Sequence, residues 1–197
     1  MALTVPLPRT PSDGGVAQWY ETRLGWAAAD GSPVRLRTGL RFDVLDLPAD
    51  AGAAVLRRID LSGPVALAGR RMRLLVAAGS AEELPGLLDW LEWGGIALDL
   101  TAVGTGGLMT APPPPGWSGS RGAAVWLRPP VPGREVEPTL PALVPFGSKA
   151  GTGGGISTDL VRLLDTVATQ CHRARLLRTN TSRANTRPSA GQPLAFS

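Results

Sequence analysis

The sequence predicts an α/β (α+β) domain in which a mixed or antiparallel sheet is flanked by helices. Short apolar runs typical of strands alternate with segments whose apolar residues recur every three or four positions, as in helices. The 197 residues are 43% hydrophobic and 18% charged, a composition typical of a folded protein with one core. Because both patterns continue through residues 13–130, we expect a single domain there.

The first half of this domain contains two helices and four strands by its pattern. Val16, Tyr20 and Leu24 share one helical stripe, which predicts a helix from Asp13 to about Gly31. Asp50 is placed to cap a second helix. This second helix is predicted at 50–59. The four strands are predicted at 34–37, 40–47, 64–68 and 72–78.

The second half is predicted to contain a helix, a hairpin and a closing strand. Ser80 and Glu83 form a capping-box pattern that begins a helix ending near residue 93. Residues 94–115 read as a hairpin, because two apolar runs flank a glycine-rich turn and four prolines end the second run. The closing strand is predicted at 123–128.

The remaining segments differ from the domain in composition. We expect an extended lead-in at 1–12, a Pro/Gly-rich linker at 131–155, a C-terminal helix at 156–178 and a disordered basic tail at 179–197. Residues 1–157 hold 14 basic and 14 acidic side chains, whereas residues 158–197 hold six arginines and two aspartates. The formal charge of +4 therefore arises entirely in the C-terminal part.

Some classes of protein do not fit this composition. One cysteine, Cys171, cannot form an internal disulfide, and a single histidine, His172, makes a zinc site of the usual kind improbable. The chain shows no apolar run long enough to span a membrane and no secretory leader. We therefore expect a cytoplasmic protein with no membrane partner.

One stretch has a recognisable order of features. The run GIALDLTAVGTGGLMTAPP, followed by AAVWLRPP, places Asp99 on a strand before a Gly-Gly turn and a Pro-Pro stop. Together with the strand that ends in Asp46 and the short helix after it, this order resembles the N-terminal domain of bifunctional DNA primase/polymerases. These domains form the prim-pol branch of the archaeo-eukaryotic primase superfamily. The resemblance spans residues 14–130 and implies a primase-polymerase-like fold, a nucleotidyltransferase site and a role in DNA replication.

The resemblance also implies site residues. In that family, two acids separated by one residue and a third acid on a later strand bind two divalent metal ions, Mg²⁺ or Mn²⁺. Asp46 takes the place of the first acid and Asp99 that of the third, which would make both catalytic and metal-binding. Pro48 stands where the second acid is expected, and Gly69-Arg70-Arg71-Met72-Arg73 where the family has a histidine. Asp43 could compensate only if the strand bulges, because a strand points Asp43 and Asp46 to opposite faces. We expect the fold to be kept, the catalysis lost, and a metal needed only by an active enzyme.

Five arginines are candidates for contacts with nucleotide or nucleic acid. Arg70, Arg71 and Arg73 either bind phosphate groups in place of the missing histidine or are solvated residues of a turn. Arg175 and Arg178 belong to a basic segment that either holds nucleic-acid phosphates without sequence preference or keeps the chain soluble.

Three functions remain open at this level. The leading hypothesis is an inactive primase-polymerase-like module that binds nucleotide or nucleic acid, or regulates a partner. The second is an active, template-dependent nucleotidyltransferase that uses Asp46 and Asp99 with a divalent metal. The third is a non-enzymatic scaffold that binds a protein partner through the Pro-rich segment at 129–145 and the last helix.

Overall fold

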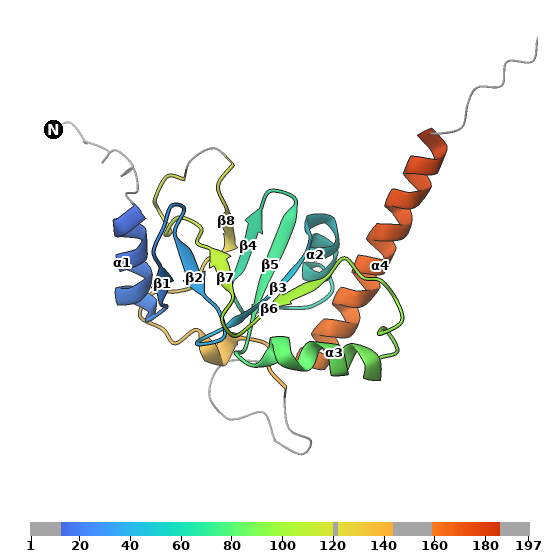
Figure 1. Cartoon of the computed structure of the whole chain (residues 1–197), viewed down its shortest axis with the longest axis horizontal. Helices are drawn as coiled ribbons and strands as arrows, with labels where there is room; N and C mark the ends of the chain where they lie inside the picture. Colours follow the sequence, from blue (N-terminus) through green and yellow to red (C-terminus); the bar gives the residue numbers. More distant parts are fainter. Residues whose placement is uncertain (1–12, 120–121, 144–158, 186–197) are drawn as a thin grey trace, which may run out of the picture.

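The computed structural model describes residues 13–119, 122–143 and 159–185. Within these residues the chain forms four α-helices and two antiparallel sheets (Figure 1), which confirms the α/β class with helices flanking a sheet. The helices are α1 (Asp13–Leu24), α2 (Ala49–Leu56), α3 (Ser80–Trp90) and α4 (Leu160–Asn185). None of the described helices is both long and apolar enough to cross a membrane. The predicted lead-in, the glycine-rich half of the predicted linker and the tail beyond residue 185 lie outside the described residues.

A five-stranded sheet in the order β6-β3-β5-β4-β8 forms the centre of the fold, and every pairing in it is antiparallel. β3 and β5 are adjacent, pair over six residues each and have mostly buried side chains, as expected for central strands. Gly69, with a φ of +58°, provides the tight turn between β4 and β5. The strands are β3 (Asp43–Pro48), β4 (Val65–Ala68), β5 (Arg71–Val76), β6 (Thr101–Val103) and β8 (Val125–Arg128).

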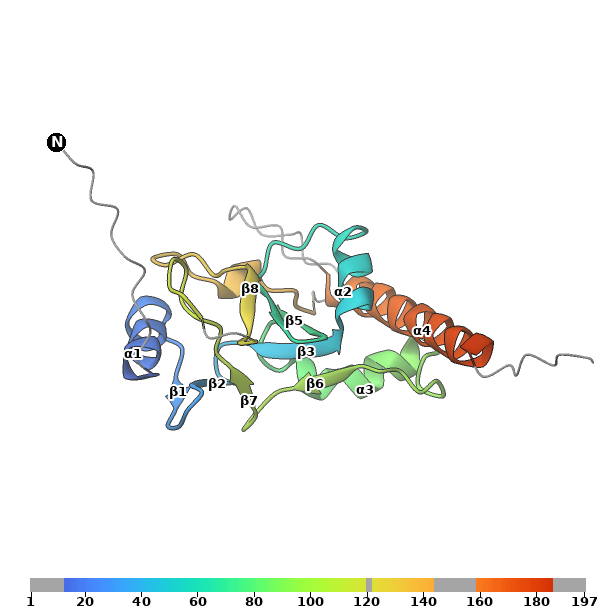
Figure 2. The ribbon, with the colours of Figure 1, turned by 90° about the horizontal axis from the view of Figure 1, so that it is seen from above.

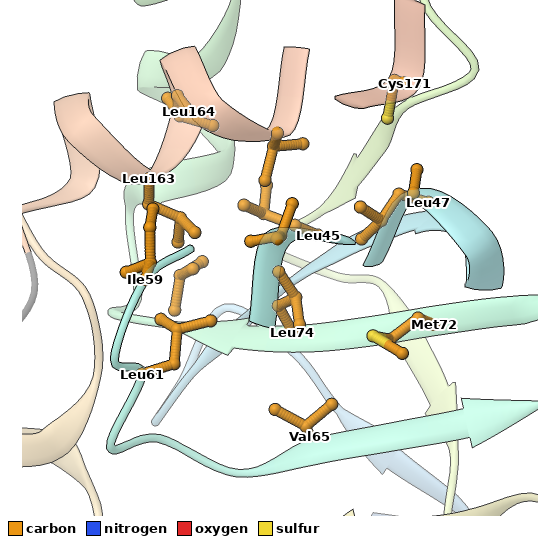
Figure 3. Packing of buried hydrophobic residues seen from close by; sticks show 14 of the residues in the cluster. Leu45, Leu47, Ile59, Leu61, Val65, Met72, Leu74, Leu163, Leu164 and Cys171 are labelled. Atoms are coloured by element: carbon orange, nitrogen blue, oxygen red, sulfur yellow. The ribbon is translucent and has the colours of Figure 1, made fainter. Parts of the chain in front are cut away.

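Three helices cover one face of this sheet. α4 packs against α2 and α3, and its buried leucines Leu163 and Leu164 meet Leu45 and Leu74 from the central strands (Figure 3). Side chains alternate between the faces of a strand, so the apolar residues at every second position of β3 and β5 point into this cluster. The C-terminal part of α4 extends past the sheet (Figures 1 and 2).

The opposite face is covered by a small sheet and α1, which lie at the other end of the molecule from α4 (Figure 2). The aromatic rings of Tyr20, Trp26 and Phe42 are fully buried in this second cluster. The Tyr20 hydroxyl donates to the Pro112 carbonyl and accepts from Trp126 Nε1, both at 2.8 Å. The small sheet has the order β1-β2-β7, with β1 (Ala28–Ala29), β2 (Arg35–Arg37) and β7 (Leu108–Thr110).

The predicted hairpin at 94–115 is wrong. β6 pairs with β3 of the large sheet, whereas β7 pairs with β2 of the small sheet, so the two apolar runs belong to different sheets. Contacts from other elements hold the turn between them: Thr38 Oγ1 donates to the Gly104 carbonyl (2.6 Å), and Glu82 accepts from the Thr105 N–H (3.3 Å). The glycine-rich turn therefore carries the chain from one sheet to the other.

Several predicted boundaries also need correction. α1 ends at Leu24 and does not continue to Gly31, because Gly25 adopts a left-handed φ of +66°. α4 continues to Asn185, beyond its predicted end at residue 178, and the tail predicted from 179 is helical to that point. The described part of the predicted linker is packed on the domain, since it contains the short 3₁₀ helix η1 (Glu137–Thr139) flanked by the buried Val136 and Leu140.

Candidate functional site

The predicted acids and arginines meet at one end of the large sheet. β3 ends where its antiparallel neighbour β5 begins, which places Asp46 opposite Arg73 and Pro48 opposite Arg71. Strand alternation directs these side chains away from the face that α2, α3 and α4 cover. The end of β3 and the start of β5 thus bring an acid and two arginines together.

Asp46 is the inner acid of this group, and its side chain is only 15% exposed. Its Oδ1 accepts from Arg71 Nε at 2.5 Å and its Oδ2 accepts from Arg73 Nε at 3.0 Å. Arg71 Nη2 also donates to the Asp46 backbone carbonyl at 2.9 Å. Both carboxylate oxygens are therefore used by guanidinium groups. Among the described atoms, Arg73 Nη1 is buried and has no hydrogen-bond partner.

Asp99 is the outer acid and comes from the connection between α3 and β6, which runs beside α4 (Figure 1). Asp99 Oδ1 accepts from Arg71 Nη1 at 2.5 Å, and Asp99 Oδ2 lies 3.5 Å from Arg178 Nη1 of α4. Its side chain is 45% exposed. Arg71 therefore lies between Asp46 and Asp99 and binds both.

Burial alone would lower the pKa of Arg71, but its hydrogen bonds to Asp46 and Asp99 outweigh this and raise the pKa above the ordinary value for arginine. The guanidinium consequently stays charged at any physiological pH. Arg71 is thus a permanent cation held between two carboxylates.

The other predicted arginines surround the same place. Arg175 Nη1 donates to the Ala97 carbonyl, which fastens the α3–β6 connection to α4, and Arg70 is exposed in the turn before β5. Two shallow pockets meet here, and both are lined by Asp99 and Arg178. One has a volume of about 380 Å³ and is also lined by Pro48, Ala49, Asp50, Gly69, Arg70 and Arg71; the other has about 480 Å³ and is also lined by Arg175 and Thr179.

Asp43 is not part of this site. It is fully buried on the opposite face of β3, where its Oδ2 accepts from the Ala81 N–H (2.9 Å) in the first turn of α3. β3 pairs continuously with β5 from Asp43 to Pro48, so no bulge there turns Asp43 toward Asp46. Burial raises the pKa of Asp43, and the hydrogen bond from Ala81 offsets this only partly. Asp43 therefore caps α3 and cannot replace the missing second acid.

The residues present do not fit a two-metal centre. Asp46 and Asp99 already bind three guanidinium groups, which would repel a divalent cation, and a Mg²⁺ or Mn²⁺ pair needs several free carboxylates. In the part of the chain that the structure describes, no three His, Cys, Asp or Glu side chains are grouped to hold a metal ion.

Comparisons with protein-family models, curated proteins and solved structures found no match. A separate pocket with a volume of about 770 Å³ lies between α1 and the loop before β8. None of the predicted site residues lines it.

The structure brings the predicted residues together, but their interactions differ from those expected from the sequence. Sequence reasoning treated Arg71 and Arg73 as substitutes for a histidine and the two acids as metal ligands, whereas the structure pairs the arginines with the acids. It also missed Asp50 and Thr179, which line the pockets. The position of Asp50 just after the strand that ends in Asp46 is the signal that points to the first of these, because such positions commonly line α/β sites.

Proposed function

We propose that this chain is a primase-polymerase-like domain that binds phosphate groups of a nucleotide or nucleic acid and does not transfer nucleotides itself. The observation that carries the proposal is the position of Arg71, which binds both acids that the family resemblance assigns to metal. A guanidinium takes up the carboxylate oxygens that metal ions would need. The same guanidinium group adds positive charge where a phosphate could bind.

The arginines supply the chemistry for a phosphate ligand. Arg70, Arg71, Arg73, Arg175 and Arg178 carry five positive charges, against three negative charges on Asp46, Asp50 and Asp99. Guanidinium groups bind phosphate oxygens through directed, charge-assisted hydrogen bonds. The buried, unpartnered Arg73 Nη1 is one donor that an oxygen of a ligand or of water would satisfy.

Binding tests the first half of the proposal. Fluorescence anisotropy with a labelled single-stranded oligonucleotide, and competition by a deoxynucleoside triphosphate, would distinguish nucleic acid from nucleotide as the source of the phosphate. We expect Arg71→Met and Arg178→Met each to weaken binding several-fold and to reduce its salt dependence. Arg23→Met is the matched control, because Arg23 is exposed on α1, away from the site. Binding by the two site variants that equals binding by the control would refute the location.

A nucleotide-incorporation assay tests the second part of the proposal, that the chain does not transfer nucleotides. The runner-up, an active nucleotidyltransferase, is favoured by the fact that Asp46 and Asp99 share one partner and so lie in one site. We expect no incorporation of labelled nucleotide on a primed template with Mn²⁺, by the wild type or by Asp46→Ala. Incorporation that is lost in Asp46→Ala, while Asp30→Ala retains it, would establish the runner-up instead.

A scaffold function remains the third candidate. Leu176 and Leu177 on α4 are 51% and 68% exposed, which is where a protein partner of the last helix would find apolar contacts. Absence of any binding to oligonucleotide or nucleotide would leave this candidate in place of the first two.

A further inference from the structure

The two acids of the site are held in different ways. Asp46 is mostly buried, and two arginine Nε atoms and Arg71 Nη2 bind its carboxylate and backbone carbonyl. Asp99 is 45% exposed, and its contacts are with single terminal nitrogens of Arg71 and Arg178. Exposed ion pairs contribute little to stability because water and salt screen them. Asp46 is therefore fixed, whereas Asp99 can exchange with another anion at little cost.

Asp99 also lies where a ligand would have to bind. Together with Arg178 it lines both shallow pockets, so its carboxylate stands at their common boundary. If Asp99 moved aside, Arg71 Nη1 and Arg178 Nη1 would both lose the carboxylate that they contact. Arg71 would keep its position, because Nε and Nη2 remain bound to Asp46.

We propose that Asp99 is an internal competitor for the phosphate ligand. Its carboxylate occupies the two guanidinium nitrogens that a phosphate group binds, and it gives way when the ligand arrives. The terminal phosphate of a nucleotide has more negative charge and more acceptor oxygens than a carboxylate, and a nucleic-acid strand presents several phosphodiester charges side by side, so either ligand can engage both arginines. This inference rests on the proposed phosphate-binding function and adds to it a built-in limit on affinity.

The test compares variants that remove the competing charge with one that removes an equal charge elsewhere. Asp99→Asn and Asp99→Ala eliminate the carboxylate, and Asp99→Glu retains it. Asp30→Asn is the matched control, because Asp30 is exposed in the turn after β1 and is not one of the site residues. Affinity is measured by anisotropy with a labelled oligodeoxythymidylate at low and at physiological salt, with deoxynucleoside triphosphate as a competing ligand. Thermal unfolding of each variant confirms that it is folded.

We expect Asp99→Asn and Asp99→Ala both to bind about three- to tenfold more tightly than the wild type at low salt. Asp30→Asn should change the affinity less than twofold, and Asp99→Glu should resemble the wild type. Tighter binding by Asp99→Asn alone would overturn the inference, because it would indicate a new amide donor and not the loss of a competitor. If both charge-removing variants bind as tightly as the wild type or more weakly, the inference is overturned as well. In that case, binding by the wild type would still support the proposed phosphate-binding function. If no form of the protein binds, both proposals fail.

Discussion

Removal of Asp46 should destabilise the fold much more than removal of Asp99. The Asp46 carboxylate is 15% exposed and binds two guanidinium groups, at 2.5 and 3.0 Å. Asp46→Ala leaves Arg73 without its anion and Arg71 with Asp99 as its remaining carboxylate. Loss of one partner of a buried ion pair costs about 3–5 kcal/mol. Because Asp46 is partly exposed, we expect the cost of its removal to lie near the lower end of this range. We therefore expect the free energy of unfolding to fall by about 3 kcal/mol.

The same substitution at Asp99 provides the comparison. Its side chain is 45% exposed, and its two exposed ion pairs contribute about 0.5 kcal/mol each, or about 1 kcal/mol together. For a chain of this size, 1 kcal/mol corresponds to about 2–4 °C in the unfolding midpoint. Asp46→Ala should therefore lower the midpoint by about 6–12 °C, and Asp99→Ala by less than about 4 °C.

Urea and thermal unfolding followed by circular dichroism would measure both effects, with Asp30→Ala as the control for loss of an exposed acid. Adding Arg73→Met to Asp46→Ala should recover part of the lost stability, because one unpaired guanidinium is removed. Equal losses for Asp46→Ala and Asp99→Ala would refute the distinction between a fixed and an exchangeable acid. So would a loss below about 1 kcal/mol for Asp46→Ala.

Three further predictions concern the scaffold of the site. Gly52→Ala should destabilise the protein by about 1–3 kcal/mol in urea unfolding, because a Cβ there would lie 2.8 Å from Met72 Cβ. Gly86→Ala, in open space on α3, should be neutral or stabilising. Tyr20→Phe should cost about 1–3 kcal/mol in the same assay, because a buried carbonyl and an indole N–H lose their shared hydroxyl partner. For Asp43 the folded-state pKa lies above the unfolded one, so the free energy of unfolding should fall as pH rises through the interval between them. The difference between wild type and Asp43→Asn across pH 3–7 should reveal this fall, and a constant difference would contradict it.

The central elements could be predicted because their patterns are local. The strand and helix over 43–56 and the strand pair 65–76 follow from apolar runs and a glycine turn within a few residues, although Pro48, and not the predicted Asp50, is the N-cap of α2. Strand alternation also predicted that Asp43 and Asp46 point to opposite faces, and the structure confirms it. Such features depend on neighbours in sequence, which the sequence displays directly.

The errors arise where distant residues decide the structure. The runs at 101–103 and 108–110 read as a hairpin, yet each pairs with a strand from the first half of the chain. The helical extension to Asn185 was missed because residues 179–185 are polar and aperiodic, although Thr179 and Thr181 donate side-chain hydrogen bonds to carbonyls one turn earlier. The pairing of Arg71 with Asp99 joins residues 28 positions apart. No local sequence pattern predicts a partner at that separation along the chain.

The charge pattern of the site links two features that looked independent in the sequence. Pro48 stands where the family resemblance leads one to expect an acid, and the residue across from it on β5 is Arg71. Because position 48 offers no carboxylate, Arg71 binds Asp46 on the neighbouring strand β3 and Asp99 in the connection between α3 and β6. Three guanidinium groups then face two carboxylates, an excess of one positive charge. Addition of divalent cations would increase that excess, whereas an anion would balance it. If the proposed function is right, the absence of an acid at position 48 and the presence of Arg71 opposite it therefore favour the same ligand, a phosphate.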